Sequence, residues 1–93
     1  MFSWDARKAV TNYAKHGVPF EEAATVFADP DALHWQDLKH SQAERRYKRL
    51  GLSFEGRLLL VVYAVRRTKD GKETIRIISA RQASRRERKA YAG

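Results

Sequence analysis

The sequence contains no cysteine and only two prolines among its 93 residues. Without cysteine, neither a disulfide framework nor a thiolate metal site can form, and the composition suits a reducing compartment. The longest apolar run, residues 58–65, is too short to span a bilayer and lies too far from the N-terminus to be a secretory segment. We therefore expect a cytoplasmic protein with no membrane partner.

Acidic residues are scarce in the second half of the chain. Residues 1–44 carry 4 Lys or Arg and 7 Asp or Glu, whereas residues 45–93 carry 15 and 4, so the net charge of +8 divides into −3 and +11. Such segregation attracts polyanions or an acidic protein, although a basic surface with no specific partner is an alternative. A chain of this length forms one domain around one core, and we expect residues 1–93 to be that domain.

The hydrophobic pattern predicts an α+β fold of one layer pair. Residues 2–4 alternate as a short strand, and a helix then runs from the N-cap Asp5 to Gly17. Its predicted apolar face consists of Ala6, Ala9, Val10, Tyr13 and Ala14. A second helix begins near Pro19, presents Phe20, Ala23, Ala24 and Phe27, and is ended by Asp29 and Pro30.

After residue 30 the spacing of hydrophobic residues changes from that of a helix to that of a strand. This change predicts four antiparallel strands at residues 33–36, 45–53, 57–67 and 74–80. The third of these is apolar throughout its centre, which is typical of a strand in the middle of a sheet. Ser84 and Glu87 have the spacing of a capping box, so a closing helix is expected at residues 84–91. The predicted order is therefore β-α-α-β-β-β-β-α, with the two N-terminal helices on one face of an antiparallel sheet and the basic residues on the other.

Known catalytic motifs are missing from the chain, which has no nucleophile elbow, phosphate loop, dinucleotide fingerprint or zinc motif. His16, His34 and His40 have no ligand-like spacing, so we expect no metal and no cofactor. The candidate residues are instead basic residues and nearby tyrosines on the later strands and the last helix. They are Arg45, Tyr47, Arg49, Arg57, Tyr63, Arg66, Arg76, Arg81, Arg85, Arg86, Arg88, Lys89 and Tyr91.

An RNA backbone is an anion that such a surface suits. The 2′-hydroxyl of RNA attacks the adjacent phosphorus, so a protein accelerates cleavage by positioning the groups and by stabilising the charge that develops. Guanidinium groups stay charged and offer paired donors to two phosphate oxygens. Tyr47, Tyr63 and Tyr91 are candidates for stacking on splayed bases.

Structural roles are the alternative for several candidates. Arg45 and Arg49 also suit a solvated strand face, and Tyr63 also suits a core. His16, near a helix end, also suits a C-terminal cap. The basic cluster of the last helix suits an acidic partner equally well.

Arg76 is the most informative candidate, because it interrupts an apolar strand segment. It lies among Ile75, Ile77 and Ile78, where a charge needs a partner or a function. It either binds an anion or pairs with Glu73, Glu55 or another carboxylate.

Two blocks of residues resemble the BrnT family of toxins, and together they extend over nearly the whole chain. The first block is Phe2, Trp4, Asp5, Lys8, Asn12, Lys15, His16, Gly17, Val18, Phe20, Glu21, Glu22 and Ala23. The second block is Glu44, Arg45, Arg46, Gly51, Ser53, Gly56, Arg57, Leu58, Arg66, residues 75–81, Ala83, Arg85, Glu87 and Tyr91.

The resemblance implies a RelE-like fold and a metal-independent endoribonuclease that inhibits translation as the toxin of a type II toxin-antitoxin system. Its implied partner is a BrnA-like ribbon-helix-helix antitoxin, through which alone operator DNA would be bound. Carried over by position, it implies Arg66, Arg76 and Arg81 as catalytic residues, with His16 and Glu22 as further candidates. Tyr63 stands where members of the family often have histidine. A non-catalytic basic module that binds RNA or an acidic antitoxin is the alternative.

Overall fold

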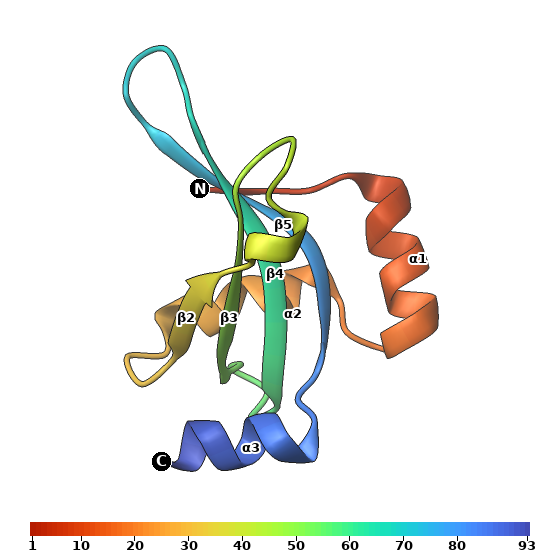
Figure 1. Cartoon of the computed structure of the whole chain (residues 1–93). Coiled ribbons are helices and arrows are strands. Elements are labelled where there is room, and N and C mark those ends of the chain that lie inside the picture. Colours follow the sequence, from red (N-terminus) through yellow and green to blue (C-terminus); the bar gives the residue numbers. More distant parts are fainter.

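The computed structural model describes all of residues 1–93 and contains one five-stranded sheet with three α-helices (Figure 1). The elements in chain order are β1 (Phe2–Ser3), α1 (Ala6–His16), α2 (Phe20–Thr25), the 3₁₀ helix η1 (Val26–Ala28), β2 (Leu33–Gln36), the 3₁₀ helix η2 (Leu38–His40), β3 (Arg46–Leu52), β4 (Leu58–Arg67), β5 (Glu73–Gln82) and α3 (Arg85–Ala92). The predicted mixed α+β class is thus confirmed. No helix is long and apolar enough to cross a membrane.

The sheet has the strand order β1-β5-β4-β3-β2. Strands β2 to β5 form the predicted antiparallel meander, and β4 lies in its middle because its apolar residues are buried on both faces. Strand β1 pairs in parallel with β5, with Phe2 opposite Ile75, a pairing that the sequence pattern leaves open. In the β4 and β5 ladder the register shifts between Val62 and Tyr63.

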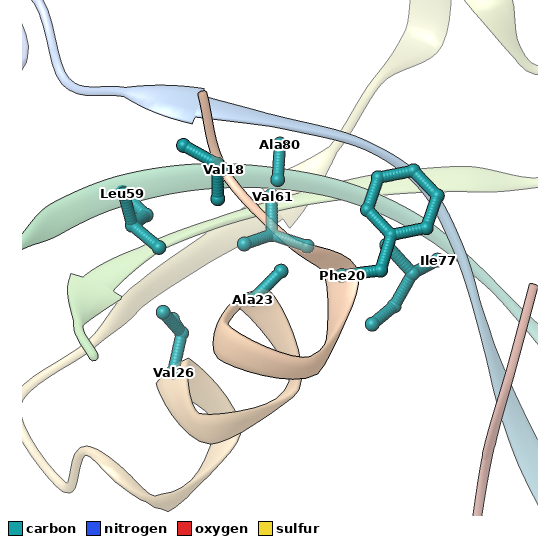
Figure 2. Close-up of a cluster of buried hydrophobic side chains, with 8 residues drawn as sticks. All are labelled: Val18, Phe20, Ala23, Val26, Leu59, Val61, Ile77 and Ala80. Carbon is teal, nitrogen blue, oxygen red and sulfur yellow. The ribbon is translucent and has the colours of Figure 1, made fainter. Parts of the chain in front are cut away.

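The main core lies between one face of the sheet and the segment that contains α2 and η1 (Figure 2). The shift in register brings Ile77 and Ala80 of β5 to this face, opposite Tyr63 and Val61 of β4. The cluster consists of Val18, Phe20, Ala23, Val26, Leu59, Val61, Ile77 and Ala80. Each large member contributes roughly 1.5–3 kcal/mol by burial, so this cluster holds the sheet against the helices.

The predicted second helix is divided in two. Its α-helical part ends at Thr25, whose hydroxyl donates a hydrogen bond of 2.7 Å to the carbonyl of Glu22. A 3₁₀ turn follows up to Asp29, because the chain tightens before the Asp29-Pro30 pair that ends the helical run.

The predicted apolar face of α1 is correct for Ala9, which packs against the core, but wrong for Val10 and Tyr13, which are 71% and 57% exposed. The buried residue is Asn12, whose side-chain amide donates to the Ala80 carbonyl at 2.8 Å and accepts from the Ala80 N–H at 3.1 Å. These backbone groups are free because β1 pairs with β5 only at Ile75 and Arg76. Of the two helices expected on one face, α2 covers it and α1 lies along the β5 side (Figure 1).

The second face of the sheet is covered at one end only. Ala83 and Tyr91 pack there against Leu50, Leu58 and Leu60, below which α3 lies (Figure 1). Helix α3 begins with the predicted capping box of Ser84 and Glu87. Toward the other end of this face, the 3₁₀ helix η2 and the segment after it lie over β4 (Figure 1) and line a pocket with Arg66 and Arg76.

Candidate functional site

Two arginines from neighbouring strands converge on one carboxylate. Arg76 Nη1 donates to Glu44 Oε1 at 2.9 Å, and Arg66 Nη2 donates to Glu44 Oε2 at 3.4 Å. The register sets this arrangement, because Arg76 of β5 is opposite Ala64 of β4, two residues before Arg66. Arg46 of β3 is also opposite Ala64, so the small alanine side chain lies between two long basic ones.

A pocket of about 420 Å³ surrounds this contact. Its lining consists of Lys8, His40, Ala43, Glu44, Arg46, Arg66 and Arg76, and we call it the basic pocket. Four permanent cations face one carboxylate there, so the basic pocket keeps an excess of positive charge even with Glu44 in place. Such a site attracts a second anion.

The positive surface extends along α1. A shallower hollow of about 220 Å³ shares Lys8 with the basic pocket and adds Lys15, His16, Ile78 and Ser79 among its lining residues. His16 therefore lies beside the middle of β5 and not against Arg66 and Arg76. The two hollows adjoin each other, because Lys8 lines both, and together they form a basic path.

His40 also reaches the basic pocket, from the segment between β2 and β3. Its Nδ1 lies 3.0 Å from Oδ2 of Asp37, which is 8% exposed. Burial raises the pKa of Asp37, but the hydrogen bond with His40 and the charges of His40 and Lys48 outweigh it, so the pKa lies below its ordinary value. Asp37 is therefore a carboxylate that fixes the imidazole ring.

Arg81, the third predicted catalytic arginine, lies elsewhere. It forms hydrogen bonds of 2.8 and 2.9 Å with the two carboxylate oxygens of Glu87 in α3. Arg81 is five positions after Arg76 along the strand, which corresponds to roughly 16 Å. The structure therefore brings Arg66 and Arg76 together but not Arg81.

Glu22 and Arg57, predicted as a catalytic and an RNA-binding residue, bind each other. Arg57 donates to the two oxygens of Glu22 at 2.9 and 2.5 Å, and Ser53 donates to the same carboxylate at 2.7 Å. The hydrogen bonds, chiefly that from Arg57, hold the pKa of Glu22 below its ordinary value. This pair borders a separate hollow of about 700 Å³ that includes Tyr13 and Phe54.

Most of the other predicted RNA-binding residues contact the rest of the protein. Tyr63 is buried between Phe27 and Tyr47, with ring centroids at 4.8 and 5.7 Å. The guanidinium of Arg49 lies 5.2 Å above the Phe27 ring. Tyr91 donates to Asp29 at 2.6 Å, and this hydrogen bond raises the pKa of Tyr91 to about 12.

The predicted partner-binding residues form a different surface. Arg85, Arg86, Arg88 and Lys89 are exposed on α3 and form no ion pair within the protein, and Arg45 is exposed just before β3. On the same helix Glu87 and Tyr91, four residues apart, point back to the protein.

The sequence pattern did not identify four residues of the basic pocket as candidates, namely Lys8, His40, Glu44 and Arg46. Strand alternation was the available signal for Arg46, since Arg46 and Lys48 share one face of β3 whereas Tyr47 and Arg49 share the other. No local signal marks Lys8, because it comes from a helix that meets the pocket only through the tertiary fold. Across the whole chain, no three His, Cys, Asp or Glu side chains are grouped so as to hold a metal ion.

Comparisons with known proteins agree on one family. The sequence model of the family described as the ribonuclease toxin BrnT of type II toxin-antitoxin systems matches residues 4–87. The comparison with curated proteins finds no match. Among solved structures, the chain is similar to the ribonuclease toxin BrnT of Brucella abortus, with 26% sequence identity, a TM-score of 0.66, and coverage of 91% of this chain and 99% of that chain. The chain belongs to the BrnT family of ribonuclease toxins of type II toxin-antitoxin systems.

Proposed function

We propose that this toxin is an endoribonuclease that cleaves RNA by attack of the 2′-hydroxyl on the adjacent phosphorus, in the basic pocket. The observation that carries the proposal is the carboxylate of Glu44 held by guanidinium groups from two neighbouring strands. A phosphodiester oxygen is also an anion that accepts hydrogen bonds from guanidinium, so the place of Glu44 suits the scissile phosphate. No metal takes part in the proposed step.

Arg66 and Arg76 have the role of stabilising charge. The phosphorane formed by attack of the 2′-hydroxyl carries more negative charge on its oxygens than the substrate does. Donors fixed in advance by strands β4 and β5 need not rearrange when that charge develops, which is how such donors lower a barrier. Arg76 is the better placed of the two, because its side chain is 21% exposed against 58% for Arg66.

Lys8 and Arg46 bind the phosphates on either side of the scissile one in this proposal. They line the basic pocket with Arg66 and Arg76, and Lys15 continues the basic path along α1. Arg45 is exposed just before β3 and is retained as an RNA-binding residue. The proposal does not depend on Arg49, Tyr63 or Tyr91, whose side chains already contact the protein.

The proposed partner is a BrnA-like ribbon-helix-helix antitoxin that docks on α3, and operator DNA is bound only through it. The exposed residues Arg85, Arg86, Arg88 and Lys89 support this proposal, because their charges are free to pair with an acidic segment. Cleavage of cellular RNA and inhibition of translation make the cytoplasm the compartment of action. Reversal of charge at Arg85 and Arg88 is expected to abolish complex formation in a pull-down. An intact complex would move the docking surface elsewhere.

The proposed activity is tested with the purified chain and RNA, with and without EDTA. We expect cleavage that EDTA does not change, with a 2′,3′-cyclic phosphate on one product and a 5′-hydroxyl on the other. Arg7→Ala is the matched control for Arg76→Ala, because Arg7 is exposed on α1 and does not line the basic pocket. Binding of RNA without cleavage by the wild type would favour the non-catalytic module instead.

A further inference from the structure

The segment between β2 and β3 contributes two side chains to the basic pocket, and both can accept or donate a proton. His40 ends the 3₁₀ helix η2, and Glu44 follows four residues later, just before β3. Both line the pocket with Arg66 and Arg76. An arginine cannot move a proton at neutral pH, so these two are the pocket's candidates for proton transfer apart from Lys8.

Hydrogen bonds to the main chain hold this segment in place. The Asp37 N–H donates to the Arg46 carbonyl at 2.7 Å, and the Ser41 hydroxyl donates to the Asp37 carbonyl at 2.5 Å. The Arg46 N–H in turn donates to the Ser41 oxygen at 3.0 Å. His40 and Glu44 therefore extend from a closed loop that is tied to the start of β3.

The ring of His40 has one nitrogen bound and one free. Nδ1 is within hydrogen-bond distance of both oxygens of Asp37, at 3.0 and 3.3 Å, whereas Nε2 has no partner in the protein. The side chain is 56% exposed, so Nε2 is accessible to a ligand in the pocket. A buried carboxylate on the far nitrogen fixes the orientation of an imidazole.

The hydrogen bonds that Glu44 accepts are ones that a bound phosphate can take over. In the free protein the two oxygens of Glu44 accept hydrogen bonds from Arg76 and Arg66. A phosphate that takes these donors releases Glu44 next to the bound nucleotide. Its two oxygens are then free to accept a hydrogen bond from the 2′-hydroxyl of that nucleotide.

We propose that Glu44 is the general base and His40 the general acid of RNA cleavage in the basic pocket. This inference rests on the proposed function. Glu44 accepts the proton of the 2′-hydroxyl while the 2′-oxygen forms its bond to phosphorus. As the bond between phosphorus and the 5′-oxygen breaks, protonated His40 gives its Nε2 proton to that oxygen. The products are a 2′,3′-cyclic phosphate and a 5′-hydroxyl, and exchange of protons with water restores both side chains.

Both acidic and basic side chains surround His40. Asp37 lies on its own element, and Lys48 is close enough to influence Asp37. The other charged residues of the pocket are Lys8 of α1, Glu44 just before β3, Arg46 of β3, Arg66 of β4 and Arg76 of β5. A bound phosphate reduces the positive sum of the charges next to the imidazole.

The test compares two RNA substrates that differ in one atom. One is an oligonucleotide that the wild type cleaves, and the other carries sulfur in place of the 5′-oxygen at the cleaved bond. A thiolate leaves without a proton, so a missing general acid matters little for the second substrate. We expect His40→Gln to cleave the ordinary RNA about 100- to 1000-fold more slowly and to recover most of the loss on the sulfur substrate. Glu44→Gln is expected to be slow on both.

The controls separate proton transfer from folding. His34→Gln is the matched control, because His34 lies on β2 and does not line the basic pocket. We expect wild-type rates from it on both substrates. The pH-rate profile of the wild type is expected to be bell-shaped, with the alkaline limb lost in His40→Gln and the acidic limb lost in Glu44→Gln.

Each other result has a distinct meaning. An equal defect of His40→Gln on the two substrates, or wild-type rates on the ordinary RNA, overturns the assignment of His40 as the acid. Wild-type rates from Glu44→Gln overturn its assignment as the base. Failure of the wild type to cleave any RNA overturns the proposed function itself, which is a different outcome from any of these.

Discussion

The two ends of strand β5 carry the same pair of residue types in two different settings. Near α3, Arg81 binds both oxygens of Glu87, and Glu87 also accepts from the Ser84 N–H at 2.8 Å within the capping box. In the basic pocket, Arg76 donates one hydrogen bond to Glu44, and Arg66 donates a second one to the other oxygen of the same carboxylate. Residues 41–45, which include Glu44, form neither helix nor strand.

These settings suggest that the ion pair of Arg81 with Glu87 is structural, whereas the ion pair of Arg76 with Glu44 can be exchanged for another anion. Glu87 has several fixed partners and ties the first turn of α3 to the sheet, so its removal should weaken the fold. Glu44 accepts only one hydrogen bond at each oxygen, and its pocket contains more cations than it neutralises. Another anion can therefore replace it with little loss of stability. We infer that the fold uses one end of β5 for stability and the other for binding the substrate.

The largest expected effect is on cleavage. Arg76→Ala should reduce the rate by about 100- to 1000-fold, the range for removal of one fixed charge-stabilising donor, with little change in thermal midpoint. Cleavage in vitro, growth arrest on expression and the thermal midpoint are measured together. For Arg81→Ala we expect any loss of activity to follow its loss of stability. If Arg81→Ala were folded and inactive while Arg76→Ala remained active, the roles of the two ends would be reversed.

The next effect is on stability. Glu87→Ala removes the paired hydrogen bonds with Arg81 and half of the capping box, and should cost about 1–2 kcal/mol. In a domain of this size that lowers the thermal midpoint by roughly 4–16 °C, as followed by circular dichroism. Glu44→Ala is the comparison, and a larger drop for Glu44 than for Glu87 would contradict the distinction.

Low pH should weaken the ion pair between Arg81 and Glu87. The hydrogen bond from Arg81 lowers the pKa of Glu87 from 4.5 to about 2. A carboxylate with a depressed pKa in the folded state stabilises the fold above its ordinary pKa, and loses that contribution as pH falls toward the folded value. The midpoint difference between wild type and Glu87→Gln should therefore shrink as the pH is lowered from about 4.5 to about 2. A constant difference over this range would mean that the ion pair contributes nothing.

The smallest expected effect is on the salt dependence of RNA binding. With 2′-O-methyl RNA, which has no free 2′-hydroxyl and cannot be cleaved, log affinity should fall linearly with log salt. The slope for single strands is about −0.7 per phosphate neutralised, so Arg76→Ala should reduce it by about 0.7. Arg81→Ala should leave it unchanged, because Glu87 occupies its donors. A wild-type slope near zero would argue against any RNA-binding surface.

Much of the fold was predictable because its signals are local. Alternation and the continuous apolar centre of β4 predicted the meander, and the capping box predicted α3. Helix α1 shows the limit of this approach. Its hydrophobic residues suggested an apolar face, but Asn12 faces the sheet, because unpaired backbone groups at Ala80 need a polar partner more than an apolar one.

The site was predictable only in part. Arg66 and Arg76 were named, together with the alternative that Arg76 pairs with some carboxylate, and in the structure that carboxylate is Glu44. Arg81, Glu22 and Arg57 were named with them on the same evidence, because charge and family resemblance do not distinguish an arginine that faces a pocket from one that faces a structural carboxylate. Their assignment to catalysis or to RNA binding remains a prediction.

The sequence by itself determined that this protein has a basic second half on an antiparallel sheet and that it resembles the BrnT toxins, because composition, period and motif are properties of the chain read in order. Only the tertiary structure decided which charges meet. The register of β3, β4 and β5 places Arg46 and Arg76 on either side of Ala64, and the fold adds Lys8 from α1 and His40 and Glu44 from the segment before β3. Electrostatic interactions depend on distances across the folded chain, and those distances do not follow from spacing along it.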